Sequence, residues 1–401
     1  MKAMVASKRL VLLAEKADTE LREHILPYWY QTMDRREGGF AGLVTDDGTC
    51  DFHHPKGVVM HSRHLWSSSA AWQERQNPLD LVTARHAFEF LSGALYDSVG
   101  KGFWWTVDSK GRPEIKNKVL YGQAFAVYGL AKYFQATAEP QALELALETF
   151  RLLESTGFDP EFGGYYEAVD RRWKVPVIQA LSRTDLACSK SMNTNLHVLE
   201  AYTALFQACG NPEVRDALER LLLVFESHVI QSSGHLGLYF DRDWTTLTDH
   251  KSFGHDIEAS WLMTEAARVL WEDQIPLVHS EKFVALARLV LRLVNEHGAL
   301  PNEVHRGQLD TTRIWWVQAE ALVGLVNGWE LTGDESFLEG AEVLWRWIEK
   351  HQIDRIHGEW FWAVAADGTP DLTRPKGGLW KTSYHNGRAC MELVQRAKKA
   401  S

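Results

Sequence analysis

Residues 120–130 read LYGQAFAVYGL, a stretch without a charged side chain. A helix that is apolar on most of its sides is normally surrounded by other parts of the protein. The next helical stretch differs, because Leu143, Ala146, Phe150 and Leu153 form one apolar stripe with charged residues between them. A buried helix followed by an amphipathic one predicts an inner and an outer layer of helices.

A glycine–aromatic marker precedes such helix pairs and recurs at intervals of roughly 60 residues. Most markers are followed by an Asp or Gly turn between short aromatic or Val-containing runs, which predicts small β-hairpins. Open helical solenoids usually have shorter repeats, of about 34 to 47 residues. We therefore expect an all-α (α/α)6 barrel of twelve helices with short β-hairpins at one end. The markers begin at Gly38, Gly102, Gly163, Gly237, Gly298 and Gly358.

The rest of the chain is compatible with one large closed fold. No proline-rich, serine-rich or charge-block linker interrupts it, so we expect a single catalytic domain over residues 1–401. Hydrophobic residues make up 45% of the chain and charged residues 24%, which are globular averages that supply a core. Proline is favoured at the first helical position, so helices are expected to begin at Pro78, Pro140 and Pro212.

Charge and cysteine usage exclude several classes of function. A net charge of −10 offers no basic field for nucleic acid or for a lipid surface. The four cysteines are far apart without a CxxC pair, which indicates a reducing compartment. The apolar run at residues 10–14 is too short for a signal peptide or a membrane span, so a cytoplasmic protein is expected. The 17 tryptophans suit the apolar faces of sugar rings.

Polar residues gather where the inner helices of the predicted barrel begin, at the end where the hairpins meet. His255 and Glu258 are three residues apart on one helical face, as are His197 and Glu200, so each carboxylate is expected to orient its imidazole. Histidines poised near neutral pH suit proton transfer at a carbon next to a carbonyl. The other candidates are Arg63, Tyr121, Gln123, Asn193, Trp315, Trp316, Gln318, Glu320, Trp380 and His385.

Three other functions could use the same residues. Two His-x-x-Glu pairs can ligate a metal, but the remaining candidates are poor ligands and Arg63 would repel a cation, so no metal is expected. A glycoside hydrolase would use Glu258 and Glu320 as its two carboxylates, which leaves the histidines unexplained. A non-catalytic sugar-binding protein is the third possibility.

The same segments carry a resemblance over nearly the whole chain. They are residues 56–59, 62–66, 123–128, 192–202, 254–261, 315–321, 358–362 and 384–388. With them the chain resembles the N-acylglucosamine 2-epimerase superfamily, and within it the cellobiose 2-epimerase branch. The resemblance implies an (α/α)6 barrel that uses no cofactor.

The resemblance also implies roles for individual residues. His255 and His385 are expected to be the acid and base on opposite faces of C2, and His197 to assist ring opening. Arg63 and Glu258 are expected to support the developing enediolate and the nearby histidine. The residues expected to hold the sugar are Tyr121, Asn193, Trp315 or Trp316, Glu320 and Trp380, with Trp380 stacking on a second glycosyl unit.

The expected reaction interconverts the glucose and mannose configurations at the reducing end of a sugar such as cellobiose or lactose. A monosaccharide mannose 2-epimerase and a mannose–fructose isomerase stay open as alternatives, because returning the proton to C1 in place of C2 gives a ketose. The partner is a small mono- or disaccharide, and the chain is a monomer or a homodimer. Asn195 and the pair Thr382-Ser383 depart from the family pattern close to the expected site.

Overall fold

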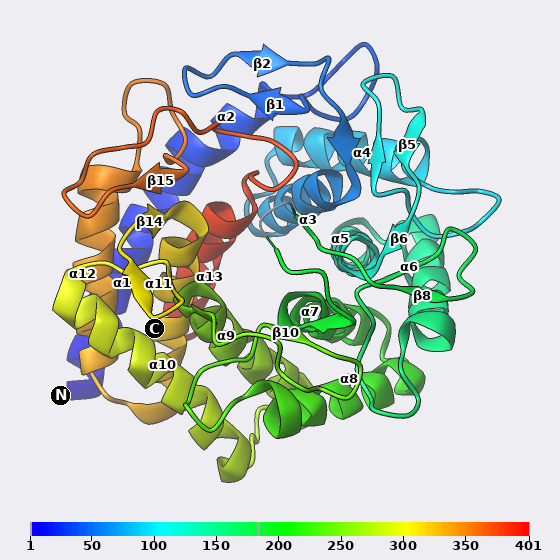
Figure 1. Cartoon of the computed structure of the whole chain (residues 1–401). Coiled ribbons are helices and arrows are strands. Elements are labelled where there is room, and N and C mark those ends of the chain that lie inside the picture. Colours follow the sequence, from blue (N-terminus) through cyan, green and yellow to red (C-terminus); the bar gives the residue numbers. More distant parts are fainter. Residues whose placement is uncertain (1, 183–184, 401) are drawn as a thin grey trace.

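The computed structural model describes residues 2–182 and 185–400, with side chains from residue 7 onward. Six helices form an inner ring around one axis (Figure 1). Neighbouring inner helices contact each other in chain order, and the last of them also packs on the first, so the ring is closed. The inner helices are α3 (Val58–Arg75), α5 (Leu120–Thr137), α7 (Met192–Cys209), α9 (Phe253–Leu270), α11 (Trp315–Thr332) and α13 (Tyr384–Ala400).

An outer ring of helices covers the inner one, which confirms the predicted (α/α)6 barrel. Each outer helix packs on the inner helix that precedes it, except α1, which packs on α13. Four outer helices continue into a short π-helix at their carboxyl ends (Leu21–Ile25, Leu153–Gly157, Phe225–Val229 and Ile348–Gln352). The outer helices are α1 (Lys2–Glu20, continued by α2, Leu26–Tyr30), α4 (Pro78–Ser92), α6 (Pro140–Leu152), α8 (Pro212–Val224), α10 (Leu277–His297) and α12 (Ser336–Trp347).

The predicted helix starts are confirmed. Helices α4, α6 and α8 begin at Pro78, Pro140 and Pro212. In each case the side chain before the proline accepts a hydrogen bond from a backbone N–H of the first turn, which satisfies one of the free donors there. None of the helices in the described part of the chain is long and apolar enough to cross a membrane.

Short strands surround the amino-terminal ends of the inner helices. A strand just before an inner helix pairs antiparallel with a strand of the next hairpin in five places, and a bridge between Val44 and Gly377 closes the ring. The pairs are β3 (Lys56–Gly57) with β4 (Thr106–Val107), β6 (Lys118–Val119) with β7 (Ala168–Val169), β9 (Lys190–Ser191) with β10 (Tyr239–Phe240), β11 (Lys251–Ser252) with β12 (Glu303–His305), and β14 (Arg313–Ile314) with β15 (Ala363–Val364). The remaining strands are β1 (Leu43–Val44), β2 (Cys50–Asp51), β5 (Pro113–Ile115), β8 (Pro176–Val177) and β13 (Gln308–Asp310).

One polar side chain in the first turn of every inner helix fastens a hairpin to the barrel. In α7, Asn195 accepts a hydrogen bond from the backbone N–H of Tyr165 (2.8 Å) and donates to the Tyr165 and Ser191 carbonyls (3.0 and 2.8 Å). Asn195, which departs from the family pattern, is therefore a structural residue. The equivalent residues are His61, Gln123, Asp256, Gln318 and Asn386.

Substitution Asn195→Ala should destabilise the protein by roughly 2–3 kcal/mol, because it leaves the buried backbone groups of Tyr165 without partners. Urea unfolding followed by circular dichroism measures the difference. Asn117→Ala, at an exposed hairpin position, is the matched control and should change stability little. A loss equal to that of the control would contradict the fastening role.

Candidate active site

The axis of the barrel is lined by six side chains, each two residues after a hairpin-fastening residue. These six side chains lie about one turn into the inner helices and form two groups, one of Arg63, Phe125 and His197 and one of Glu258, Glu320 and Arg388. The guanidinium of Arg63 lies 4.5 Å from the ring centre of Phe125, and that ring lies 4.6 Å from the His197 ring. The six residues are Arg63, Phe125, His197, Glu258, Glu320 and Arg388.

Each of the three predicted histidines is held through its Nδ1 atom. The Nδ1 of His197 lies 2.7 Å from Glu200, as the His-x-x-Glu spacing predicts. The Nδ1 of His385 lies 2.6 Å from Glu320. The Nδ1 of His255 lies 2.8 Å from the hydroxyl of Ser252.

The predicted pairing of Glu258 with His255 is wrong, because Glu258 accepts a hydrogen bond from Arg388 instead. Glu320 has contacts inside the protein through both of its oxygens. Its Oε1 contacts His385 and Arg388, and its Oε2 accepts from the indole of Trp261 at 2.9 Å. Glu320 therefore orients His385.

The rings of His255 and His385 both lie close to the ring of one tryptophan, Trp316. Their centres are 4.7 and 5.8 Å from the ring centre of Trp316. The neighbouring Trp315 is 6.3 Å from His385, but it is buried against Trp362. Of the two candidate tryptophans, Trp316 is therefore the one that contacts both histidines.

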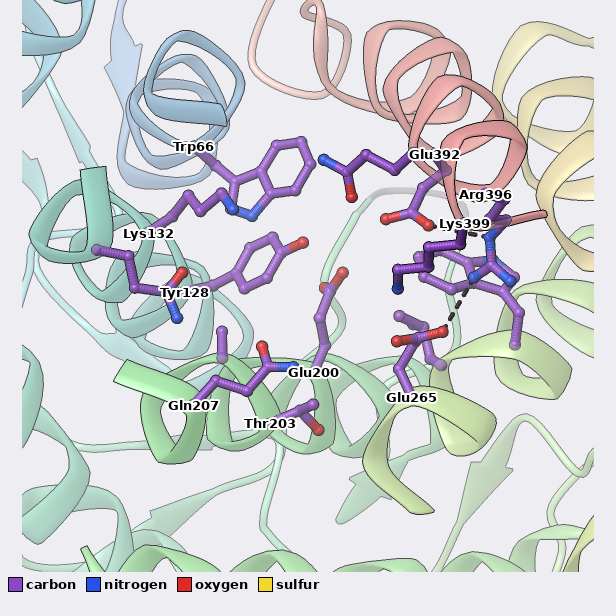
Figure 2. A pocket seen from close by; sticks show the side chains of 15 residues that line it. Trp66, Tyr128, Lys132, Glu200, Thr203, Gln207, Glu265, Glu392, Arg396 and Lys399 are labelled. Carbon is purple, nitrogen blue, oxygen red and sulfur yellow. Dashed lines mark hydrogen bonds and ion pairs between the residues drawn. The ribbon is translucent and has the colours of Figure 1, made fainter. Parts of the chain in front are cut away.

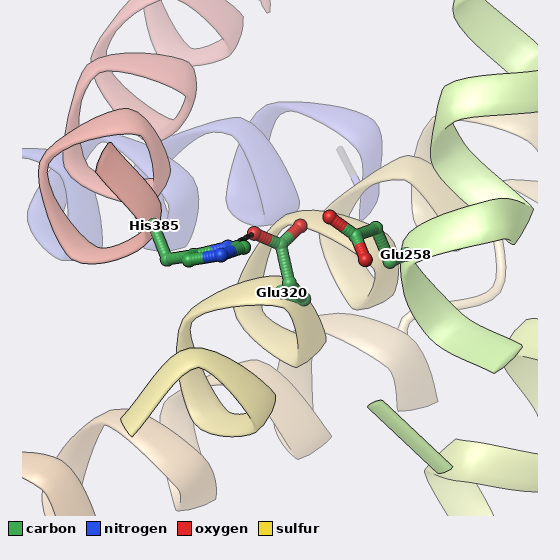
Figure 3. A group of neighbouring side chains, drawn as sticks. All are labelled: Glu258, Glu320 and His385. Atoms are coloured by element: carbon green, nitrogen blue, oxygen red, sulfur yellow. Dashed lines mark hydrogen bonds and ion pairs between the residues drawn. The ribbon is translucent and has the colours of Figure 1, made fainter. Parts of the chain in front are cut away.

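Arg388 is the centre of the charged network below the histidines, and the sequence reasoning missed it. Its guanidinium contacts Glu200, Glu258 and Glu320, and all four side chains are almost fully buried. Figure 3 shows Glu258 and Glu320 pointing at each other from two helices, with His385 beside Glu320. The signal that could have revealed Arg388 is its repeat position, which corresponds to those of Arg63 and His197.

Burial and charge set different pKa values for the three carboxyls. Burial alone would raise the pKa of Glu200, but Arg388 and the hydrogen bonds from His197 and Tyr384 outweigh it and lower the pKa to about 2. Burial, followed by repulsion from Glu320, raises the pKa of Glu258 well above its usual value. Burial also raises the pKa of Glu320, against the opposing charge of Arg388.

Burial lowers the pKa of all three histidines, which favours the neutral ring. Burial lowers the pKa of His255 to about 3. Burial, with Arg63 and Arg388 close by, lowers the pKa of His385 well below 6.5. Burial also lowers the pKa of His197, although Glu200 opposes it. A neutral ring that donates from Nδ1 to a carboxylate carries a free electron pair on Nε2, which makes it a proton acceptor.

Arg63 lies near the end of the barrel where the hairpins meet, which we call the mouth of the barrel. It donates to the hydroxyl of Tyr121 at 3.0 Å and to the backbone carbonyl of Trp380, and its buried Nε has no hydrogen-bond partner among the described residues. The Trp380 ring lies 5.7 Å from that of Tyr121 and 5.9 Å from that of Trp105. A cation is thus fixed beneath a wall of aromatic rings.

Asn193 lies beside His255 at the edge of a cavity of about 40 Å³. Its Oδ1 is buried and has no hydrogen-bond partner in the described part of the chain. Leaving such an acceptor unpaired costs about 1–3 kcal/mol, so its position favours a ligand hydroxyl as the missing donor. Thr382 has a structural role, since its hydroxyl accepts from the backbone N–H of Tyr384 and caps α13.

The geometry argues against two of the alternative readings. Glu258, Glu320 and His385 bring ligand atoms within 4.8 Å of one another, but the Arg388 guanidinium already binds both carboxylates, so these residues do not fit a metal ion. In a glycoside hydrolase the two carboxylates stand apart with the sugar bond between them. Here one nitrogen of Arg388 contacts both.

Histidines held through Nδ1 inside an (α/α)6 barrel fit an enzyme of the isomerase class that acts on carbohydrates. Comparison with known proteins gives the family. The N-acylglucosamine 2-epimerase family matches residues 38–389, and the chain belongs to this family.

Individual relatives are similar over nearly their whole length. The cellobiose 2-epimerase of Dictyoglomus turgidum is 38% identical over 389 residues, which cover 96% of this chain and 99% of the relative. The solved structure of cellobiose 2-epimerase from Spirochaeta thermophila is 44% identical with a TM-score of 0.94, covering 97% of this chain and 98% of that one. A D-mannose isomerase of Marinomonas mediterranea is more distant, at 21% identity over 395 residues, with 94% of this chain and 97% of the relative covered.

The lowered histidine pKa values predict an unusual pH profile. Protonation of a catalytic base removes activity as the pH falls, but here the fall should come only near the lowered pKa. We expect kcat/KM, which reports groups of the free enzyme, to change by no more than about twofold between pH 7 and pH 6. Initial rates over this range measure it. A fall centred at pH 6.5 or higher would show that the histidines keep ordinary pKa values.

Proposed function

We propose that this protein epimerises the reducing-end sugar of a β-linked disaccharide of the cellobiose or lactose type at C2. The observation that carries this proposal is the arrangement of three histidines with Nδ1 fixed and Nε2 left for the substrate, two of them in contact with Trp316. The names of the relatives that match over the full chain support the substrate class.

The reaction begins with ring opening, because the C2 hydrogen becomes acidic only when C1 is a carbonyl. His197 is the group for this step. Its Nε2 accepts the proton of the anomeric hydroxyl as the C1–O5 bond breaks, Glu200, which stays ionised, stabilises the resulting imidazolium, and the imidazolium then gives the same proton to O5. Tyr121, whose ring centre lies 5.0 Å from that of His197, borders the same space.

The configuration at C2 is inverted by two histidines that approach from opposite faces. His385 donates from Nδ1 to Glu320, so its Nε2 is a base that removes the C2 proton of one epimer. His255 is held by the Ser252 hydroxyl, which can donate to Nδ1, so its Nε2 can carry the proton that is returned to C2, and the proton that His385 removed then passes through solvent to the Nε2 of His255, which restores both rings. The roles exchange in the reverse reaction.

Arg63 stabilises the enediolate that forms between the two proton transfers. A guanidinium fixed by hydrogen bonds to Tyr121 and Trp380 needs no rearrangement when negative charge develops on the substrate oxygens. Asn193, with its unpaired Oδ1, accepts from a sugar hydroxyl. The second glycosyl unit stacks on Trp380, at the mouth of the barrel.

Incubation of the protein with cellobiose, lactose, mannose and glucose in deuterated buffer tests the proposal. We expect the C2 epimers of the disaccharides, with deuterium at C2 of the product. Deuterium at C1 of a ketose would favour the aldose–ketose isomerase, and turnover of the monosaccharides alone would favour a mannose 2-epimerase. Absence of C2 exchange with all four sugars would refute the proposal.

A further inference from the structure

A second cavity, of about 270 Å³, lies at the opposite end of the barrel from the histidines (Figure 2). Its walls come from the later turns of α3, α5, α7, α9 and α13, whereas the histidines belong to the first turns of α7, α9 and α13. Trp66, Tyr128, Lys132 and Glu392 are among its lining residues. The two openings therefore face opposite ends of the molecule.

A single layer of side chains separates this far-end cavity from the reaction site. Glu200 and Trp261 both line the cavity. On the other side, Glu200 holds His197, and the Trp261 indole donates to Glu320, which holds His385. A molecule in the far-end cavity would therefore touch the residues that orient two catalytic histidines.

Two aromatic side chains, Trp66 and Tyr128, form part of one wall of the far-end cavity. The rings of Trp66 and Tyr128 stack with centres 5.3 Å apart and planes 15° from parallel. Around them Lys132, Gln135 and Gln207 have no side-chain hydrogen bond or ion pair to any described residue. The ring edges left by this stack lie beside side chains with free donors and acceptors, and this combination of apolar and polar groups suits a sugar ring, which has apolar C–H groups and a rim of hydroxyls.

Charge and size narrow the class of ligand. The cations Lys132, Arg396 and Lys399 are balanced by the lining carboxylates Glu200, Glu265 and Glu392, so nothing selects an anion. Sites for drug-sized ligands span roughly 300–1,000 Å³. The far-end cavity lies just below this range and suits one ring but not two.

We propose that the far-end cavity binds one neutral monosaccharide ring, separately from the reaction site, and that this ring alters turnover through Glu200 and Trp261. The proposal goes beyond the C2 epimerisation proposed above. It gives the protein a second sugar site that responds to monosaccharide while a disaccharide occupies the mouth.

The probe is methyl β-D-glucopyranoside, which has no free anomeric hydroxyl and cannot open its ring to become a substrate. Saturation-transfer NMR measures its binding with and without saturating cellobiose, which fills the mouth. We expect a signal that survives cellobiose in the wild type. Lys132→Met should weaken it by about tenfold, the value of one hydrogen bond to a charged group, and Gln207→Trp, which fills the far-end cavity, should abolish it.

Lys350→Met, at an exposed position on the outer ring, is the matched control and should bind as the wild type does. The glucoside should lower kcat for cellobiose without changing KM in the wild type and the control, but not in Gln207→Trp. Purely competitive inhibition, or a signal equal in wild type and Gln207→Trp, would overturn the proposal. If cellobiose is not a substrate, the binding of the glucoside to the wild type and to Gln207→Trp, measured without cellobiose, still tests the far-end site.

Discussion

Substitution His385→Asn should lower kcat for epimerisation by roughly 10²–10⁴-fold, the usual contribution of a general acid or base. Asparagine retains a polar side chain of similar reach, but it cannot accept a proton at neutral pH. The asparagine amide can donate to Glu320 in place of the imidazole. The fold should therefore survive, and circular dichroism should be unchanged. Steady-state rates with cellobiose measure the loss.

The two-histidine mechanism predicts more than a loss of rate. In His385→Asn the remaining histidine can still remove the C2 proton of one epimer and return a deuteron to the same face. His255→Asn should behave likewise with the other epimer. Each variant is therefore expected to exchange C2 hydrogen of a single epimer without epimerising it, and the two variants should select opposite epimers. Exchange of both epimers by either variant would contradict the assignment.

The alternation of helices predicted two layers, and the repeat length of roughly 60 residues, longer than that of open solenoids, favoured the closed barrel. An uncharged stretch such as residues 120–130 has to be surrounded, and an amphipathic neighbour has to cover it. Once this pair is repeated six times after hairpin signals, few closed arrangements remain. The prolines at Pro78, Pro140 and Pro212 then set the starts of three outer helices.

The site was only partly predictable, because spacing along a helix does not say which way each side chain turns. His197 and Glu200 meet as their spacing indicates, but the same spacing fails for His255 and Glu258. The partner of His255 is Ser252, in the strand before the helix, and no helical rule points to it. Arg388 joins carboxylates from three other helices, a relation that exists only when the ring closes.

Removal of that arginine should have the largest effect on stability. In Arg388→Met the carboxyls of Glu200, Glu258 and Glu320 lose their shared cation while they stay buried. Breaking a buried ion pair by removing one partner typically costs about 3–5 kcal/mol, since the charge left behind is neither solvated nor compensated. Urea unfolding should show a loss of this size, together with loss of epimerisation, because His385 depends on Glu320 for its orientation.

Arg112→Met is the matched control, because it breaks an Arg–Asp pair whose arginine side chain is 75% exposed. Exposed pairs contribute about 0–1 kcal/mol, so this variant should unfold almost as the wild type does. Arg388→Lys keeps the charge but loses the fork of donors, so its stability should lie between that of Arg112→Met and that of Arg388→Met. This variant can still be measured if Arg388→Met does not fold. Equal stability of Arg388→Lys and Arg388→Met would mean that the guanidinium holds the network by packing, since charge would then make no difference.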